Sequence, residues 1–371
     1  MLSVNILIDN SKIVDYFISP LINTKRRIRA LGYNIRFITN LSERNTACDI
    51  LLLLSKPFFN LVNETESILS ESSISLKTIN KIKESTNKLI WVDTSDSTSL
   101  THFELMPYID LYLKKQLFVD RDNYRKDFKG GRIFTDYYCS TFGIQDSTPD
   151  IGYIKLEKKY EEKLGLIWNI GFGDMNNAFG YRRYLYKILP GKIKTNYNVK
   201  VINPNVEKNY DIFLKTTANL SRESVTYHRI ELLREIDRII SKNKLVGFTQ
   251  GKYLKEKEFK KVLALTKLMP SPFGWGEIGV RDFEAFIYGA TLLKPDISYM
   301  ETFPNFFLEN ETYVPFKWDF SDLEEKIMFL LEEEKIRKEI AEKGQHLYRD
   351  SISLQGMSKF VEFFIDSINK G

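Results

Sequence analysis

The chain has 371 residues, of which 43% are hydrophobic and 28% are charged, a balance that excludes a disordered or fibrous protein. This length exceeds what one hydrophobic core usually supports, so two domains are expected. The formal net charge of +5 arises from 54 basic and 49 acidic residues that are spread along the chain, which argues against a nucleic-acid-binding protein.

Short apolar runs alternate with helical patterns in the first third of the chain. The runs predict strands at residues 4–8, 34–39, 49–54, 88–93 and 110–113. Between them lie stretches long enough for crossover helices, such as residues 74–88. Strands that alternate with helices predict a parallel sheet that is covered on both faces. Residues 1–195 are therefore predicted to form an N-terminal Rossmann-like domain.

A less regular region follows. Residues 163–170 have the pattern of one more strand, and residues 181–189 have helical spacing before Pro190 and Gly191 interrupt it. The connection between the two domains is expected near residues 190–208.

The alternation then restarts and predicts a second Rossmann-like domain over residues 205–350. Strands are expected at residues 211–216, 244–248, 268–271, 291–294 and 312–316. Helices are expected at residues 225–241, 256–267, 280–288, 321–332, 335–350 and about 354–368. Ser321 is the predicted N-cap of its helix, because a serine hydroxyl can accept an early backbone N–H. The fold class predicted from the whole pattern is α/β.

The cysteine content and the first residues point to a cytoplasmic protein. Cys48 and Cys139 are too few for a disulfide framework and fit a reducing compartment. The start of the chain lacks the basic and apolar regions of a signal peptide, and the strongest apolar run, at residues 50–54, is too short to span a bilayer. A weak attraction to anionic lipid at the inner face of the membrane remains open.

Residues 271–322 contain the pattern that carries chemistry: a strand, a glycine-bearing turn, a helix and a second strand. Gly274 and Gly276 allow φ above zero and let a ligand approach the main chain. The helix that follows points its positive end at the turn, which favours an anion. Glu284 inside this helix can accept paired hydrogen bonds from two vicinal hydroxyls, as on a ribose, and Glu277 and Asp282 are competing acids.

This stretch resembles the C-terminal motif of GT-B glycosyltransferases related to the group 1 families. The shared features are the turn Phe273-Gly274-Trp275-Gly276, the helix segment Phe283-Glu284-Ala285-Phe286, and the strand approach Gly289-Ala290-Thr291-Leu292-Leu293. The resemblance covers about residues 211–350 in organisation and 270–322 in motif. It implies two Rossmann-like domains facing a cleft, with the donor on the second domain, the acceptor on the first, and the C-terminal helix, residues 352–371, packed back on the first.

The resemblance also implies roles for single residues. Glu284 is expected to bind the donor ribose, and the turn of Gly274, Trp275 and Gly276 to lie against the diphosphate or the sugar. Many retaining members place two glutamates eight residues apart, but position 276 is glycine here. Glu277 lies seven residues before Glu284, so its catalytic role and the stereochemical outcome stay open.

Basic and acidic groups around the motif complete the predicted site. The candidate cations for the diphosphate are Lys215, Arg222, Arg229 and Arg281, which can offset its charge without a metal. No cofactor is expected, and no Asp-x-Asp pattern indicates a metal site. Asp93 or Asp96, at the end of the strand at residues 88–93, is the candidate general base or acceptor ligand. The region of Arg132 and Asp136 is a second candidate for contact with the acceptor. The three histidines are dispersed, and only His102 is a candidate for a catalytic histidine.

The predicted function is transfer of a sugar from a nucleoside-diphosphate sugar to a glycan or lipid-linked acceptor. The pathway implied by the resemblance is synthesis of cell-surface polysaccharide, lipopolysaccharide or glycoprotein. Two alternatives stay open: a sugar-nucleotide epimerase on the same fold, and a non-catalytic module that binds a glycan or a partner. The sequence distinguishes neither the nucleotide base nor the sugar.

Overall fold

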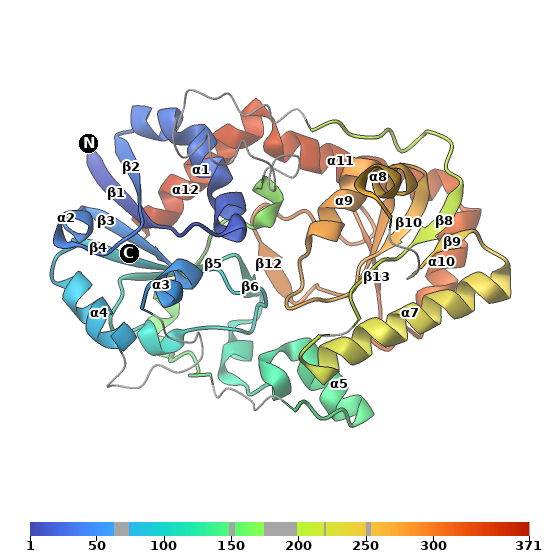
Figure 1. Cartoon of the computed structure of the whole chain (residues 1–371), viewed down its shortest axis with the longest axis horizontal. Coiled ribbons are helices and arrows are strands. Elements are labelled where there is room, and N and C mark those ends of the chain that lie inside the picture. Colours follow the sequence, from blue (N-terminus) through green and yellow to red (C-terminus); the bar gives the residue numbers. More distant parts are fainter. Residues whose placement is uncertain (63–73, 148–152, 174–198, 219, 250–253, 371) are drawn as a thin grey trace.

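A computed structural model describes residues 1–62, 74–147, 153–173, 199–218, 220–249 and 254–370. Two α/β units lie side by side, the N-terminal one at the left of Figure 1 and the C-terminal one at the right. Each is built on a parallel sheet, which confirms the predicted architecture of two Rossmann-like domains.

The N-terminal sheet has six parallel strands in the order β2-β1-β3-β4-β5-β7. Their bounds are β1 Leu2–Leu7, β2 Tyr33–Ile38, β3 Ile50–Leu54, β4 Lys88–Asp93, β5 Leu111–Lys114 and β7 Leu164–Leu166. Its helices are α1 Lys12–Ala30, α2 Glu43–Thr46, α3 Ser55–Val62 and α4 Ile74–Lys83. The central strand β3 is buried throughout, because helices cover both faces of the sheet, and a strand of that kind needs apolar residues at every position.

The C-terminal sheet has five parallel strands in the order β13-β11-β10-β8-β9. Their bounds are β8 Tyr210–Phe213, β9 Gly247–Phe248, β10 Thr266–Pro270, β11 Thr291–Pro295 and β13 Val314–Phe316. Its helices are α7 Glu223–Asn243, α8 Glu256–Ala264, α9 Val280–Tyr288, α10 Leu323–Glu332 and α11 Glu334–Ile352. The prediction of Ser321 as an N-cap is wrong: α10 begins at Leu323 after Asp322, whose side chain accepts the N–H of Lys317 instead.

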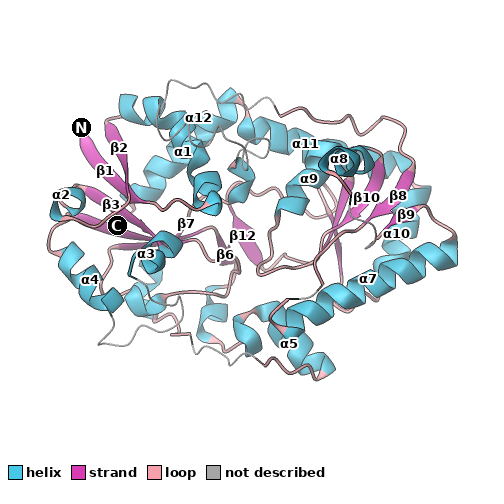
Figure 2. Cartoon of the chain, viewed as in Figure 1, coloured by secondary structure: helices cyan, strands magenta, loops and turns pink. Residues whose placement is uncertain are grey.

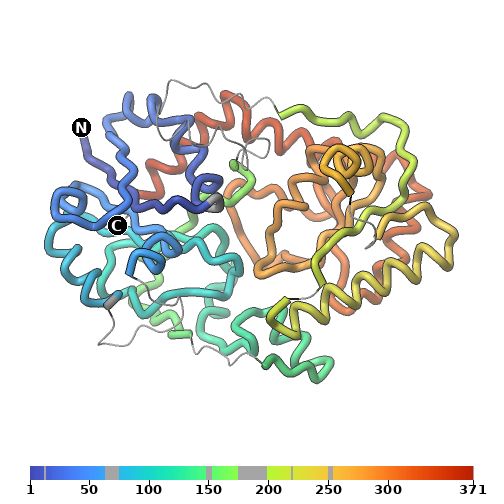
Figure 3. Tube along the Cα trace, in the orientation of Figure 1, coloured from blue at the N-terminus to red at the C-terminus, as the bar shows by residue number. Residues whose placement is uncertain are grey.

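Three elements join the two domains. Strand β6, Gln116–Phe118, pairs antiparallel with β12, Met300–Thr302, near the centre of Figure 2. Helix α5, Ile133–Phe142, packs against α7, and the last helix, α12 Leu354–Asn369, returns to pack against α1, as the red end of the trace in Figure 3 shows. The predicted helix at residues 181–189 and much of the predicted connection lie outside the described residues.

Short helical turns complete the described chain. They cover Phe103–Leu105, Arg121–Arg125, Lys129–Gly131, Lys158–Lys163 and Ile170–Phe172.

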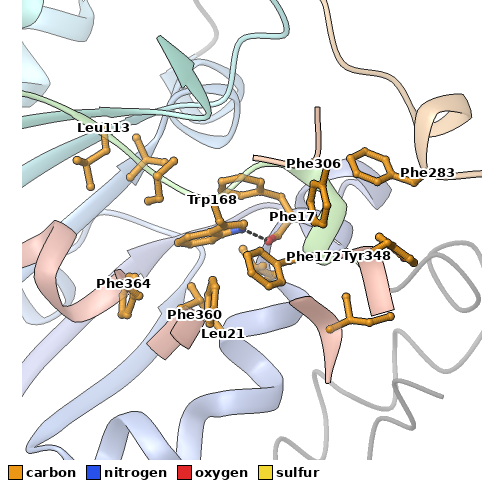
Figure 4. Packing of buried hydrophobic residues seen from close by; sticks show 14 of the residues in the cluster. Phe17, Leu21, Leu113, Trp168, Phe172, Phe283, Phe306, Tyr348, Phe360 and Phe364 are labelled. Atoms are coloured by element: carbon orange, nitrogen blue, oxygen red, sulfur yellow. Dashed lines mark hydrogen bonds between the residues drawn. The ribbon is translucent and has the colours of Figure 1, made fainter. Parts of the chain in front are cut away.

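One hydrophobic cluster runs through both domains (Figure 4). Trp168 stacks on Phe17 of α1 with ring centroids 4.7 Å apart, and its indole N–H donates to the Phe17 carbonyl at 2.8 Å. Phe360 of α12 packs edge-on against the same indole. The cluster continues to Phe283 and Phe306 of the C-terminal domain. Because the domains share this core, it helps to fix how they face each other.

Candidate functional site

The glycine turn lies where predicted, beyond the carboxyl end of β10 and before α9. Its backbone does not use the predicted freedom, because neither Gly274 nor Gly276 has a positive φ. Gly276 is needed for a different reason: a Cβ at this position would lie 1.7 Å from the carbonyl oxygen of Asp96, in the other domain. The Gly274 N–H donates to the Gly276 carbonyl at 3.0 Å and closes the turn. The turn is thus a point of close contact between the two domains.

Helix α9 carries Glu284 on its outer side, paired with Arg281 one turn earlier. The side chain of Glu284 is 21% exposed and that of Arg281 40% exposed. Partial burial raises the pKa of Glu284, and the charge of Arg281 opposes this rise. Arg281 also lies 4.6 Å above the ring of Phe259 in α8. An acid and a guanidinium are therefore displayed side by side near the positive end of a helix.

The inner side of α9 is held by Asp282, which the sequence offered as a competing acid. Its carboxylate pairs with Lys294 of β11 at 3.0 Å, and both side chains are 0% exposed. It also accepts the Ser271 hydroxyl at 2.5 Å and the Gly279 N–H at 2.9 Å, so it caps the helix. Asp282 therefore fixes the helix to the sheet.

Arg229 lies across the glycine turn. Its Nε donates to the Phe273 carbonyl at 2.8 Å, and one terminal nitrogen donates to the Thr217 carbonyl at 2.7 Å. The other terminal nitrogen lies 2.8 Å from the Cβ position of Gly274. This cation joins the segment after β8 to the turn.

The other two predicted cations have different surroundings. Arg222 is buried and pairs with Asp146 at 2.8 Å, which directs its charge to the segment after α5. Lys215 is half-buried just beyond β8. Arg229 and Arg281, rather than Arg222, are thus the arginines that accompany the turn and α9.

Asp93, a predicted catalytic residue, is 0% exposed at the end of β4. Its carboxylate pairs with Lys114 at 2.9 Å and accepts the Tyr112 hydroxyl at 2.6 Å and the Ser95 N–H at 2.8 Å. Burial alone would raise the pKa of Asp93, but the ammonium of Lys114 and these hydrogen bonds hold it well below its usual range. The structure thus gives Asp93 a structural position, because a sealed, paired carboxylate does not meet a substrate.

Asp96, unlike Asp93, lies at the surface. Its side chain is 63% exposed and pairs with Lys115 at 3.0 Å. Desolvation opposes ionisation, but Lys115 outweighs it and lowers the pKa of Asp96. Asp96 is therefore an ionised, accessible acid whose backbone touches Gly276 of the turn.

Glu277 is 0% exposed and points into the N-terminal domain. Its carboxylate accepts the Ser97 hydroxyl at 3.2 Å, the Thr98 N–H at 3.0 Å and the Gln116 amide at 2.8 Å. The Tyr299 hydroxyl, next to β12, donates at 3.2 Å. We call Glu277, Ser97, Thr98, Gln116 and Tyr299 the Glu277 cluster. The sequence could not show it, because three of its donors come from the other domain.

Arg132 reaches the turn from the N-terminal domain. Its Nε donates to the Trp275 carbonyl at 2.9 Å, and its guanidinium lies 5.3 Å from the centre of the Trp275 ring. The indole is 38% exposed. Asp136 accepts the Lys129 N–H at 3.1 Å and does not share this contact.

A buried histidine that the sequence left unassigned also supports the turn. The Phe273 N–H donates to His228 Nε2 at 3.0 Å, and His228 Nδ1 lies 2.7 Å from the Tyr138 hydroxyl. The Tyr138 hydroxyl donates to the Trp318 carbonyl at 2.8 Å. Desolvation lowers the pKa of His228 to about 3, so it is neutral, and these partners assign the proton to Nδ1. His102, the one histidine that the sequence offered for catalysis, is buried between aromatic rings and Glu104.

A pocket of about 490 Å³ lies beside the carboxyl ends of β11 and β13. Its lining residues are Tyr137, Asp296, Glu309, Pro315, Phe316, Lys317, Trp318, Asp319, Asp322 and Lys326. None of the predicted site residues lines it. It is joined to the turn through Trp318, whose ring packs edge-on against Phe273 at 5.8 Å.

Among the described residues, no three His, Cys, Asp or Glu side chains are grouped so that they could hold a metal ion. Within the same part of the chain, no helix has the length and apolar content needed to cross a membrane.

Comparison with known proteins addresses the motif directly. The family model described as glycosyl transferase-like matches residues 230–357, which include the glycine turn and all of α9. Over these residues the C-terminal domain resembles the glycosyl transferase-like family. This match confirms the resemblance predicted from residues 270–322 and identifies a transferase enzyme.

Solved structures of glycosyltransferases are similar to the whole chain at low identity. A glycosyltransferase from Rickettsia africae is 11% identical over 100% of this chain and 99% of its own, with a TM-score of 0.45. HepE from Anabaena, in complex with UDP, is 8% identical over 99% of this chain and 100% of its own, with a TM-score of 0.44. An alpha-glucosyltransferase in complex with UDP is 10% identical over 100% of both chains, with a TM-score of 0.45. No curated protein sequence matches the chain.

Proposed function

We propose that the chain transfers a sugar from a nucleoside-diphosphate sugar to an acceptor glycan. The observation that carries this proposal is the pair of Glu284 and Arg281 on α9, inside the segment that matches the glycosyl transferase-like family. The pair lies beyond the carboxyl end of β10, and ligands of open α/β sheets bind at such ends.

The groups around α9 suit the parts of the donor. The Glu284 carboxylate can accept hydrogen bonds from the two vicinal hydroxyls of a ribose. The positive end of α9 and the guanidinium of Arg229 lie near the glycine turn and can offset the charge that develops on a leaving diphosphate. Trp275, whose ring is 38% exposed, is a candidate surface for the sugar.

The acceptor is proposed to meet the donor turn from the N-terminal side and from the pocket at β11 and β13. Asp96 is ionised and accessible, so it can accept a hydrogen bond or a proton from an acceptor hydroxyl. The pocket offers the aromatic rings of Tyr137 and Trp318 together with four carboxylates, a combination that suits a polyhydroxylated ligand.

The test is a thermal-shift panel with UDP, GDP, ADP, CMP and TDP on the wild type and Glu284→Ala. A ligand that binds only the folded state stabilises it, by about 2.7 kcal/mol in the free energy of unfolding when the ligand concentration is a hundred times its Kd. This gain raises the melting temperature. We expect one nucleotide to raise Tm, the rise to vanish in Glu284→Ala, and the exposed-glutamate control Glu339→Ala to keep it. A missing shift with all nucleotides would contradict the donor site and favour the non-catalytic module.

We also propose that transfer needs no metal, since Arg229 and Arg281 supply positive charge next to the turn. Turnover of a sugar donor that carries the nucleotide identified by the panel should then be unchanged by EDTA. Donor cleavage that EDTA abolishes and Mg²⁺ restores would overturn this part of the proposal.

A lipid-linked acceptor would be met at an anionic membrane surface on the cytoplasmic side, and we propose the end of α1 as the contact. Arg26 and Arg29 are exposed there, beside Leu31 at 56% and Met1 at 74% exposure. Each cation near an anionic surface contributes about 1 kcal/mol. We expect sedimentation with phosphatidylglycerol vesicles, none with phosphatidylcholine vesicles, and at least a tenfold weaker affinity in Arg26→Gln/Arg29→Gln. Equal binding by this variant would exclude the contact. The polysaccharide, lipopolysaccharide or glycoprotein that receives the sugar is proposed from the family alone.

A further inference from the structure

The acid nearest the glycine turn is not available to a ligand. Glu277 is fully buried, and its two carboxylate oxygens accept from Ser97, Thr98, Gln116 and Tyr299. A carboxylate has about four acceptor sites, so these donors saturate it. A sugar hydroxyl would have to displace one of them and leave a buried donor unpaired.

The same contacts determine where the loop after β4 lies. Ser97 and Thr98 of this loop donate directly to Glu277 at 3.2 and 3.0 Å. Gln116 uses one amide nitrogen twice, donating to Glu277 at 2.8 Å and to the Asp96 carbonyl at 2.6 Å. Glu277 is therefore connected to the backbone of Asp96 in two ways. One connection runs through Gln116, and the other runs through Ser97 and Thr98, which follow Asp96 in the chain.

Gly276, next to Glu277, allows the backbone of Asp96 to pack closely against the glycine turn. The Asp96 backbone fills the space that a side chain at position 276 would need, since a Cβ there would meet the Asp96 carbonyl oxygen and carbon at 1.7 and 2.2 Å. With the loop fixed in this way, the Asp96 carboxylate stays exposed and paired with Lys115 beside the turn.

We propose that Glu277 is a positioning residue, which holds the loop of Asp96 against the glycine turn so that the Asp96–Lys115 pair faces the donor. In this arrangement Asp96 of the N-terminal domain is the acid that contacts the substrate. Glu277 of the glycine turn attaches the loop of Asp96 to the C-terminal domain. This proposal rests on the proposed donor site, and it predicts that Glu277 affects turnover without affecting nucleotide binding.

The experiment compares Glu277→Gln with the wild type by three readouts. The first is hydrogen exchange of the Thr98 amide, which should lose about tenfold to a hundredfold of its protection when its acceptor is weakened. The second is the nucleotide thermal shift, which should persist. The third is donor cleavage, whose kcat should fall about tenfold to a hundredfold while the donor KM stays within about twofold.

Matched variants separate this role from a general loss of stability. Glu301→Gln removes a second glutamate at the domain junction, one that pairs with Arg121 and does not contact the loop, and should keep wild-type kcat. Ser97→Ala removes one neutral donor and should lower kcat only a few-fold in a folded protein. Glu277→Gln and Gln116→Met should be non-additive in kcat, because both act on one attachment.

Each outcome decides between the two proposals. A wild type that binds no nucleotide refutes the donor site, and unchanged Thr98 protection in Glu277→Gln refutes the attachment independently. Loss of the nucleotide shift in Glu277→Gln would show that Glu277 contacts the donor and would overturn the positioning role. Additive effects of the Glu277 and Gln116 variants would overturn it as well.

Discussion

A fully buried aspartate–lysine pair supports the segment that faces the partner domain in each half of the molecule. In the N-terminal domain Asp93 pairs with Lys114 at 2.9 Å, and in the C-terminal domain Asp282 pairs with Lys294 at 3.0 Å. All four side chains are 0% exposed. The pairs are alike in burial and length but differ in what they connect.

The N-terminal pair connects the ends of two neighbouring strands, β4 and β5. The C-terminal pair connects a strand to a helix, because Asp282 lies in the first turn of α9 and also accepts the Gly279 N–H. Breaking either should cost similar stability, since each leaves a buried lysine without its partner. Only the C-terminal pair, however, orients the helix that carries Glu284. The comparison predicts losses of stability in the same range for both pairs, but a loss of nucleotide binding for the C-terminal pair alone.

The largest effect is expected for Asp282→Asn. Removing this charge leaves Lys294 buried and unpaired, which typically costs about 3–5 kcal/mol in the free energy of unfolding. Urea unfolding at pH 7 measures this loss. Because α9 also loses part of its cap, the nucleotide thermal shift should shrink in the protein that remains folded.

The exposed variant Asp366→Asn is the control for Asp282→Asn and should stay within about 0.5 kcal/mol of the wild type. Asp282→Asn/Lys294→Met should recover much of the loss, since a buried ion pair can be exchanged for apolar packing. A stable Asp282→Asn with an unchanged nucleotide shift would mean that the pair does not fix α9.

Asp93→Asn should cost about 3 kcal/mol, the lower end of the same range. Its amide oxygen can still accept from one of two donors, the Tyr112 hydroxyl or the Ser95 N–H, which now donate to different carboxylate oxygens at 2.6 and 2.8 Å. The folded variant should keep the full nucleotide shift, because Asp93 does not contact α9. A lost shift at full folding would show that the two pairs are not independent, and would break the comparison.

Features that depend on residues close together in the sequence could be predicted, whereas features that depend on contacts between distant segments could not. The apolar run at Ile50–Leu54 is local, and it predicted the buried strand β3 correctly. The motif around Glu284 is also local, and the family match confirms it. Asp93 was a candidate catalytic residue because a polar residue after a strand is typical of a site, but the structure buries it completely. The correcting signal was present, since Lys114 ends the next strand of a parallel sheet and must lie beside it.

The junction could not be predicted from the sequence. Strands β6 and β12 have only three residues each, too few for a periodic pattern, and about half of the chain separates them. The donors to Glu277 depend in the same way on how two folded domains face each other. Gly276 showed the limit clearly: a glycine was expected for its φ, whereas its missing side chain makes room for Asp96.

A smaller effect is expected for the pH dependence of the free energy of unfolding that Asp93 contributes. Since the folded-state pKa of Asp93 is lowered from 3.8, the folded protein binds this proton less tightly than the unfolded chain does. Its stabilisation is complete above the unfolded pKa and is lost as the pH falls through the folded pKa. The difference in unfolding free energy between wild type and Asp93→Asn should therefore be constant from about pH 7 to 5 and narrow below 3.8. Urea titrations at a series of pH values measure it, and a difference that widens towards acid would reverse the sign and refute the pairing.

The smallest effect is expected for Tyr138→Phe, which breaks a neutral contact between the domains instead of an ionic one. The lost hydroxyl leaves the Nδ1–H of His228 and the carbonyl of Trp318 without their partner, at a cost of about 1–2 kcal/mol. Because burial lowers the pKa of His228 to about 3, the ring stays neutral from about pH 5 to 8, and the loss should not vary across that range. Urea unfolding at both ends of the range tests this, with Tyr137→Phe on the same helix as the control. A loss that grows at pH 5 would mean that His228 is charged there, and that the neutral contact between α5 and α7 is an ionic one after all.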